Sequence, residues 1–137
     1  MIFHLSNDIK HLILCLFLVI PLVSQAQVKS EQHFIARTIF MRALEERIDP
    51  ITMLKVAWCE SRFKINAINI NKNKTIDIGV FQINSVHHKA LNPYDYRENI
   101  EYAISLVKKR NWADFRASET CWKAPRPEIY QYLALDG

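Results

Sequence analysis

Residues 59–63 read Cys-Glu-Ser-Arg-Phe, and residues 75–85 read Thr-Ile-Asp-Ile-Gly-Val-Phe-Gln-Ile-Asn-Ser. The first run closes a segment whose apolar residues recur at helical spacing, whereas the second is typical of a strand that ends in amide side chains. Residues 66–74 between them are rich in Asn and Lys, a composition typical of a turn or hairpin tip. The sequence therefore predicts a helix that carries Glu60 near its end and a hairpin that follows it.

The rest of the chain is predicted to be mostly helical, and two of the helices have clear start signals. Asp49 is followed by Pro50; an Asp side chain caps free N–H groups, and Pro has no N–H to lose. Asp95 stands in the same position before another helix. Helices are predicted over 31–47 with Ser30 as N-cap, over 50–60, over 97–110, from about residue 112 and after Pro127, and strands over 67–70 and 75–78. Many helices around one small hairpin make a mostly helical α+β fold, with the hairpin beside the candidate active-site groove.

Residues 1–26 are predicted to be a signal peptide. Residues 12–23 form an apolar run too short to span a bilayer comfortably, and Lys10 precedes it. Residues 24–26, Ser-Gln-Ala, supply the small residues that a signal peptidase reads. An uncleaved membrane anchor is the alternative. We expect a mature domain over 27–137, of a size for one hydrophobic core, located in the periplasm or outside the cell.

The predicted mature domain contains two cysteines, Cys59 and Cys121. In an exported protein such an isolated pair is expected to be a disulfide rather than two free thiols. A metal site is not predicted, because the pair has no CxxC spacing and the adjacent His87 and His88 would point in different directions. No cofactor is predicted either.

The net charge of +4 favours no class of partner by itself. Such a balance suits approach to an anionic cell wall. It also suits nucleic acid, but the basic residues are scattered and no recognition motif accompanies them. An ordinary solvated surface accounts for the charge, and nucleic acid is not a predicted partner.

Glu60 and Asp77 are the candidate catalytic residues. Two carboxylates with amide donors nearby are the groups needed to cleave a glycosidic bond. Glu60 is the candidate general acid, which must stay protonated above the usual carboxyl pKa, and apolar surroundings would achieve this. The aromatic residues close in sequence that could supply such surroundings are Trp58, Phe63 and Phe81.

Three polar residues near the two carboxylates are candidate substrate contacts. In an extended stretch Gln82 and Asn84 would share one face, from which their amide groups could bind N-acetyl and hydroxyl groups of a sugar. Ser61, next to the acid, could hydrogen-bond the same sugar. Each residue taken alone is more typical of a structural role, and only the ordered set indicates a site.

The run from Ala57 to Ser85 resembles the catalytic core of the lysozyme-like superfamily. Glu60-Ser61 and Gly79-x-x-Gln82-Ile83-Asn84 resemble signatures of soluble lytic transglycosylases, and the spacing from Glu60 to Asp77 is similar to that in C-type lysozymes. The resemblance implies a lysozyme-like fold. It also implies cleavage of peptidoglycan glycan strands between N-acetylmuramic acid and N-acetylglucosamine.

The resemblance leaves two roles open for Asp77. In C-type lysozymes the matching Asp is the second catalytic carboxylate of a hydrolase. In lytic transglycosylases one glutamate donates a proton and then takes one from the 6-hydroxyl of the sugar, which gives a 1,6-anhydro end. Asp77 would then cap the turn or act through its charge. We expect the transglycosylase reaction, with hydrolysis as the alternative.

Other features of the resemblance bear on the groove and on the class of protein. Trp112 and Phe115 resemble the aromatic pair that closes the groove of C-type lysozymes. The Tyr-Asn-Ala-Gly motif of most lytic transglycosylases is missing, with residues 116–122 where it would lie, and so are most of the C-type lysozyme cysteines. A non-catalytic sugar-binding module and a regulatory protein are the alternatives from other classes. The resemblance also implies a secretion, conjugation or pilus apparatus as a partner.

Overall fold

The computed structural model describes the backbone of residues 7–134 and the side chains of residues 25–134. The chain forms two compact units, Met1–Glu31 and Gln32–Gly137. Every candidate site residue lies in the second unit, which is therefore the one described in detail below.

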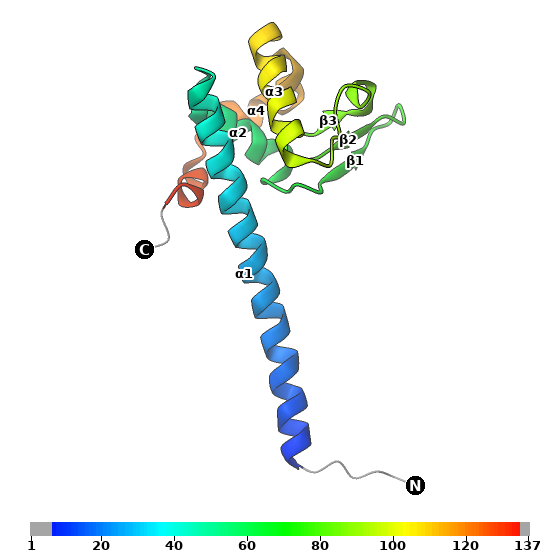
Figure 1. Ribbon diagram of the computed structural model, residues 1–137, viewed down its shortest axis with the longest axis vertical. Coiled ribbons are helices and arrows are strands. Elements are labelled where there is room, and N and C mark those ends of the chain that lie inside the picture. Colours follow the sequence, from blue (N-terminus) through cyan, green and yellow to red (C-terminus); the bar gives the residue numbers. More distant parts are fainter. Residues whose placement is uncertain (1–6, 135–137) are drawn as a thin grey trace. The chain divides into compact units, whose positions relative to one another are not determined.

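Helix α1 (Asn7–Glu45) begins in the first unit and ends in the second (Figure 1). The prediction of an N-cap at Ser30 is wrong, because residues 22–30 contain neither Gly nor Pro and are helical themselves. The predicted signal peptide, residues 1–26, lies almost wholly outside the residues whose side chains are described, and it stays a prediction. In the described part of the chain, no helix has the length and apolar character needed to cross a membrane.

Helices make up most of the second unit. After α1 they are α2 (Pro50–Ser61), η1 (Ser85–His87), α3 (Tyr96–Arg110), η2 (Ala113–Ser118), α4 (Glu119–Lys123) and η3 (Pro127–Tyr132), the η elements being 3-10 helices. Helix α2 is central, because it packs against α4, η2 and η3. Its residues Met53, Leu54, Val56 and Ala57 are fully buried, so the helix that carries Glu60 is fixed in the core.

The start signals predicted for α2 and α3 are both confirmed. The Asp49 carboxylate accepts hydrogen bonds from the backbone N–H groups of Ile51 and Thr52, at 3.3 and 3.1 Å. The Asp95 carboxylate caps α3 in the same way, and that helix begins at Tyr96, one residue before the predicted start. Each cap satisfies N–H groups that have no partner within the helix, so the first turn is set by the local sequence.

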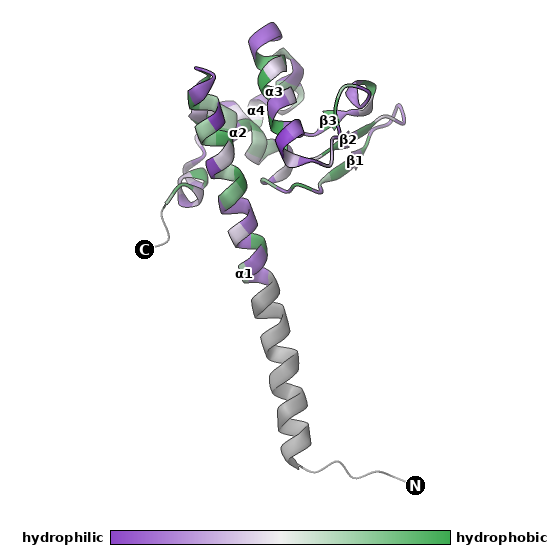
Figure 2. Cartoon of the chain, in the orientation of Figure 1, coloured by the Kyte–Doolittle hydropathy of each residue, from purple (hydrophilic) through white to green (hydrophobic). Residues whose placement is uncertain are grey.

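Three short strands form an antiparallel sheet in the order β1-β2-β3 (Figure 1). They are β1 (Ile68–Ile70), β2 (Ile76–Ile78) and β3 (Ile83–Asn84). The predicted hairpin is confirmed as β1 and β2, and its tip is hydrophilic (Figure 2). Strand β3 is an addition to the prediction. Gln82, just before it, has a φ of +48°, so the expected continuous extended stretch is wrong at that residue. The mostly helical, lysozyme-like α+β fold class is confirmed.

A buried asparagine of α3 holds the turn that follows β2. Asn99 is fully buried; its Nδ2 donates to the carbonyl oxygens of Ile78 and Pro93, at 2.9 and 3.1 Å, and its Oδ1 accepts from Phe81 N–H at 2.9 Å. Gly79 in this turn has a φ of +82°, and a Cβ there would lie 2.4 Å from Asn99 Nδ2. Only glycine allows this approach. Asn99 thereby ties the turn that leads to Gln82 to the packed helix α3.

Candidate active site

Two hollows in the surface of the second unit adjoin at Glu60, Asp77 and Gln82, which line both of them. The first, of about 260 Å³, is called the helical hollow and is also lined by Phe81, Ile83, Asn84, His87, Leu106, Asp114, Phe115 and Ala117. The second, of about 550 Å³, is called the strand hollow and is also lined by Cys59, Ser61, Arg62, Lys64, Ala67, Ile68 and Asn69. Because the two hollows share these three residues, they are treated together as one groove that contains Glu60. Every residue predicted as catalytic or substrate-binding therefore lines this groove.

Glu60, in the last turn of α2, is held by a residue from the other side of the core. Ser118 Oγ, at the end of η2, donates a hydrogen bond of 2.6 Å to Glu60 Oε1. Burial raises the pKa of the Glu60 carboxyl above its usual value; the Ser118 hydrogen bond opposes this, and the negative charge of Asp77 adds to it. Glu60 is thus a carboxyl group that keeps its proton at higher pH than an exposed glutamate.

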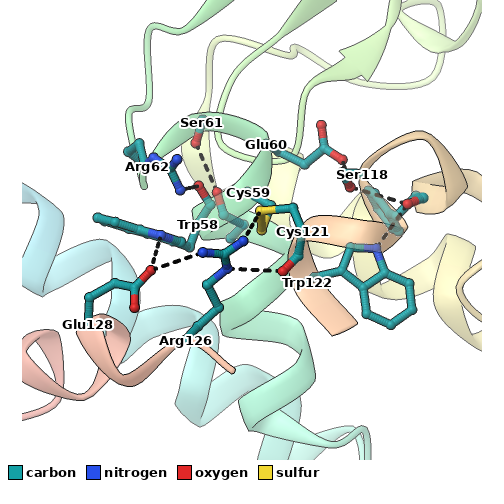
Figure 3. Close-up of a disulfide and its surroundings, with 12 residues drawn as sticks. Trp58, Cys59, Glu60, Ser61, Arg62, Ser118, Cys121, Trp122, Arg126 and Glu128 are labelled. Carbon is teal, nitrogen blue, oxygen red and sulfur yellow. Dashed lines mark hydrogen bonds and ion pairs between the residues drawn. A yellow bond between two sulfur atoms is a disulfide. The ribbon is translucent and has the colours of Figure 1, made fainter. Parts of the chain in front are cut away.

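The apolar surroundings of Glu60 differ from the predicted set. Phe81 lines the helical hollow as predicted, and its ring packs against Phe115 with 5.9 Å between centroids. Trp58 and Phe63 line neither hollow; they pack against each other, at 5.6 Å, and against Tyr132. Trp58 extends away from Glu60 (Figure 3) because two residues along a helix correspond to roughly 200° around its axis.

Asp77 is held by amide side chains on both of its oxygens. Asn84 Nδ2 donates to Oδ1 at 2.7 Å, and Asn71 Nδ2 donates to Oδ2 at 2.8 Å. The register of the sheet sets this arrangement, because Asp77 of β2 pairs with Asn84 of β3. Asn84 Oδ1 also accepts from Val86 N–H at 3.2 Å, which starts η1. The side chain of Asp77 is therefore fixed close enough to Glu60 for its charge to act there.

Ser61 and Gln82 make hydrogen bonds to the backbone within the site. Ser61 is buried, and its Oγ donates to the Val80 carbonyl oxygen at 2.8 Å. Gln82 Nε2 donates to the carbonyl oxygens of Ala67 and Gly79, at 3.1 and 2.9 Å. These bonds join the end of α2 and the start of β1 to the turn after β2. The substrate contacts expected of Ser61, Gln82 and Asn84 stay predictions.

A disulfide joins Cys59 of α2 to Cys121 of α4, with 6.0 Å between the Cα atoms. Arg126 Nε donates to the Cys121 carbonyl oxygen at 3.0 Å, and Arg126 Nη2 donates to Cys121 Sγ at 3.2 Å (Figure 3). Cys59 is next to Glu60, and Cys121 follows closely on Ser118. The disulfide therefore keeps Ser118, the hydrogen-bond donor, beside Glu60.

Replacement of both cysteines, as Cys59→Ala/Cys121→Ala, is expected to lower the free energy of unfolding. The two cysteines are 62 residues apart. In the loop-entropy model, loss of a disulfide that closes a loop of this length lowers the free energy of unfolding by about 4 kcal/mol, because the unfolded chain is no longer restricted. Urea denaturation followed by tryptophan fluorescence measures the change. Dithiothreitol should destabilise the parent protein by a similar amount and leave the double variant unaffected. A loss below about 0.5 kcal/mol, the usual range for surface substitutions, would contradict the prediction.

Several features of the site have no signal in the sequence. Ser118, Asn71 and Asn99 each act through a side-chain bond to a partner that no periodic pattern relates to them. The predicted aromatic pair is divided, since Phe115 lines the helical hollow while Trp112 packs on Trp122 outside it, with 5.9 Å between ring centroids.

Among the described residues, no group of three or more His, Cys, Asp or Glu side chains is placed to hold a metal ion.

Comparison with known proteins agrees with this geometry. Residues 37–112, more than half of the chain, match the model of the transglycosylase SLT domain. The chain belongs to the transglycosylase SLT domain family. The matched region contains Glu60, Asp77 and Asn99, whereas Ser118 and Cys121 follow it.

One curated relative is similar to part of the chain. The chain is 40% identical over 70 residues to Protein IpgF of Shigella flexneri, an alignment that covers 44% of this chain and 46% of that protein. The chain thus spans about half of the length of this relative. No solved structure matches.

Proposed function

We propose that the protein cleaves the glycan strands of peptidoglycan between N-acetylmuramic acid and N-acetylglucosamine, as a lytic transglycosylase. The observation that carries the proposal is the position of Glu60. It is a partly buried carboxyl group whose pKa is raised by burial, and it lies where two hollows adjoin. A glycan strand that fills both hollows would have a glycosidic bond beside this group. Membership of the SLT domain family supports the same reaction.

Glu60 would act first as an acid and then as a base. The protonated carboxyl donates its proton to the glycosidic oxygen as the bond to the anomeric carbon of muramic acid breaks. The resulting carboxylate takes a proton from the 6-hydroxyl of the same sugar, whose oxygen closes on the anomeric carbon. The proton returns to Glu60, the product has a 1,6-anhydro end, and no water is consumed. Ser118 supports the first step, because its hydrogen bond stabilises the carboxylate that remains after the proton has been donated.

Asp77 would assist this reaction through its charge. Both of its oxygens accept hydrogen bonds from asparagine amides, so attack on the sugar would require one of these bonds to be given up. The fixed negative charge would instead act as a local field that helps Glu60 to keep its proton, while the two hydrogen bonds hold the sheet beside it. Hydrolysis with Asp77 as the second catalytic carboxylate is the alternative, and it is supported by the fact that Asp77 lines both hollows together with Glu60.

The test is mass spectrometry of the fragments that the purified protein releases from peptidoglycan. A transglycosylase releases 1,6-anhydro ends, lighter than hydrolysis products by one water. Asp77→Asn should then raise the activation free energy by only about 1–2 kcal/mol, the cost of a lost turn or cap interaction. Ordinary reducing ends, with a loss of about 10²–10³-fold in Asp77→Asn, would instead establish the hydrolase. Binding to cell wall without release of fragments would indicate a non-catalytic module.

The proposal includes a location outside the cytoplasm. A disulfide beside the acid suits an oxidising compartment such as the periplasm or the cell exterior. The predicted signal peptide agrees with this. Peptidoglycan is the proposed partner, and a secretion, conjugation or pilus apparatus stays a prediction from the family resemblance.

A further inference from the structure

The two hollows of the groove differ in charge. Apart from the residues that they share, the charged residues of the strand hollow are Arg62 and Lys64, both cationic and both exposed. The helical hollow instead has the acidic Asp114, together with His87. The arginine and lysine residues that line the groove are therefore both in the strand hollow.

Arg62 and Lys64 are fixed at the edge of the strand hollow by the residue between them. Phe63 is fully buried, and it shares a left-handed backbone conformation with Arg62, with φ values of 61° and 58°. Such a conformation is uncommon for residues other than glycine and is kept only where the surroundings impose it. Gln32 Nε2 also donates to the Arg62 carbonyl oxygen, at 2.9 Å. The segment is thus anchored, with one basic side chain on each side of a buried phenylalanine.

Neither cation is neutralised within the protein. In the range 25–134, where side chains are described, neither Arg62 nor Lys64 has a carboxylate within ion-pair distance. Arg62 donates to the Trp58 carbonyl oxygen at 3.2 Å and stacks on the Trp58 ring at 4.6 Å, which holds the guanidinium in place and leaves its charge uncompensated. By contrast, Arg110 is paired with Asp114 at 2.9 Å. Two uncompensated cations at one side of a groove point to an anionic group on the ligand.

We propose that Arg62 and Lys64 bind the carboxylates of the peptide attached to muramic acid, and so make the protein specific for peptide-bearing strands. This inference rests on the proposed function. Every second sugar of a strand is a muramic acid, whose lactyl group carries a peptide with free carboxylates. A strand that occupies the strand hollow with two consecutive sugars therefore places a peptide-bearing sugar there. The exposed position of both cations suits a peptide that leaves the groove better than a lactyl carboxylate beside the sugar ring.

The test compares three substrates: peptide-bearing strands, the same strands with their peptide carboxylates amidated, and strands stripped of peptide by an amidase. For the parent protein, kcat/KM should be highest on the peptide-bearing strands. In Arg62→Gln/Lys64→Gln the ratio of kcat/KM for peptide-bearing over amidated strands should fall about three- to tenfold, as for two partly exposed charge pairs. The fall should be smaller at high salt, because exposed charges are screened.

Two further variants complete the design. Arg97→Gln/Lys109→Gln removes the same charge from exposed positions outside both hollows and should leave the ratio unchanged. Arg62→Lys/Lys64→Arg keeps both charges and should keep most of the preference. The ratios can also be measured by binding, with Glu60→Gln protein that cannot turn over the strands.

The outcomes separate this inference from the proposed function. A protein that releases fragments from all three substrates equally, and whose ratio is unchanged in Arg62→Gln/Lys64→Gln, would overturn the inference and leave the function in place. A loss confined to the stripped strands, in which the amidase has freed the lactyl carboxylate, would assign the cations to that carboxylate and overturn the assignment to the peptide. Absence of release from every substrate would overturn the proposed function itself.

Discussion

Glu60→Gln is expected to remove nearly all lytic activity. Glutamine keeps the shape of the side chain but has no transferable proton, and general acid–base catalysis contributes about 10²–10⁴-fold to a rate. Release of fragments from purified peptidoglycan measures the effect. Glu31→Gln, a change at an exposed glutamate that lines neither hollow, is the matched control and should keep parent activity. If Glu60→Gln keeps more than about a tenth of the parent activity, well outside that range, Glu60 is not the acid.

The same variant is expected to be more stable than the parent protein near neutral pH. The pKa of Glu60 is raised in the folded state, chiefly by burial, so the folded protein binds this proton more tightly than the unfolded chain does. The contribution to stability is complete below the usual carboxyl pKa and is lost as the pH rises through the raised pKa. Glutamine does not titrate. The Tm of Glu60→Gln should therefore exceed that of the parent at pH 7, by more than at pH 4, and a lower Tm at pH 7 would contradict the assignment of a raised pKa.

Asn99→Leu is expected to be the most destabilising single substitution of those considered. Leucine has a similar size but removes the hydrogen bonds that Asn99 makes to one buried N–H group and to two carbonyl oxygens. Each such group costs about 1–3 kcal/mol, so the loss approaches the whole stability of a small domain, roughly 5–15 kcal/mol. Circular dichroism and urea denaturation measure it, with Asn66→Leu, at an exposed asparagine, as the control.

A second variant at the same position keeps this prediction testable if Asn99→Leu does not fold. Asn99→Asp retains the acceptor for Phe81 N–H but places carboxylate oxygen against the carbonyl oxygens of Ile78 and Pro93. It should be destabilised too, and more so as the pH rises and the carboxyl group ionises. An effect of Asn99→Leu below about 1 kcal/mol, that of one ordinary hydrogen bond, would show that Asn99 does not hold the turn.

The parts of the fold that the sequence predicts are those with local causes. Asp49 and Asp95 start helices because a carboxylate caps the N–H groups two and three residues ahead, and a pattern of that length is visible in the sequence. The hairpin of β1 and β2 is equally local. Glu60 and Asp77 could be paired because their spacing matches a family motif, and the groove does bring them together.

The parts that the sequence does not predict depend on contacts between distant residues. Ser118 is 58 residues from Glu60, and nothing in the intervening pattern relates the two. Asn99 stands inside a helix, where asparagine is usually unfavourable, and only its buried bonds to the β2 turn explain its presence. Strand β3 follows a residue with a positive φ, so the alternation of apolar and polar residues does not describe the chain at Gln82.

Because Ser118 donates a hydrogen bond to Glu60, the pKa of Glu60 depends on two segments of the chain that can evolve separately. The motif around Glu60 carries the carboxyl group, and the segment around Ser118, which follows the region matched by the family model, adjusts how tightly that group holds its proton. Changes in the second segment can therefore shift the pKa of Glu60 and leave the motif around Glu60 intact. The Cys59–Cys121 disulfide keeps the segment around Ser118 next to Glu60, even where the sequence of that segment varies.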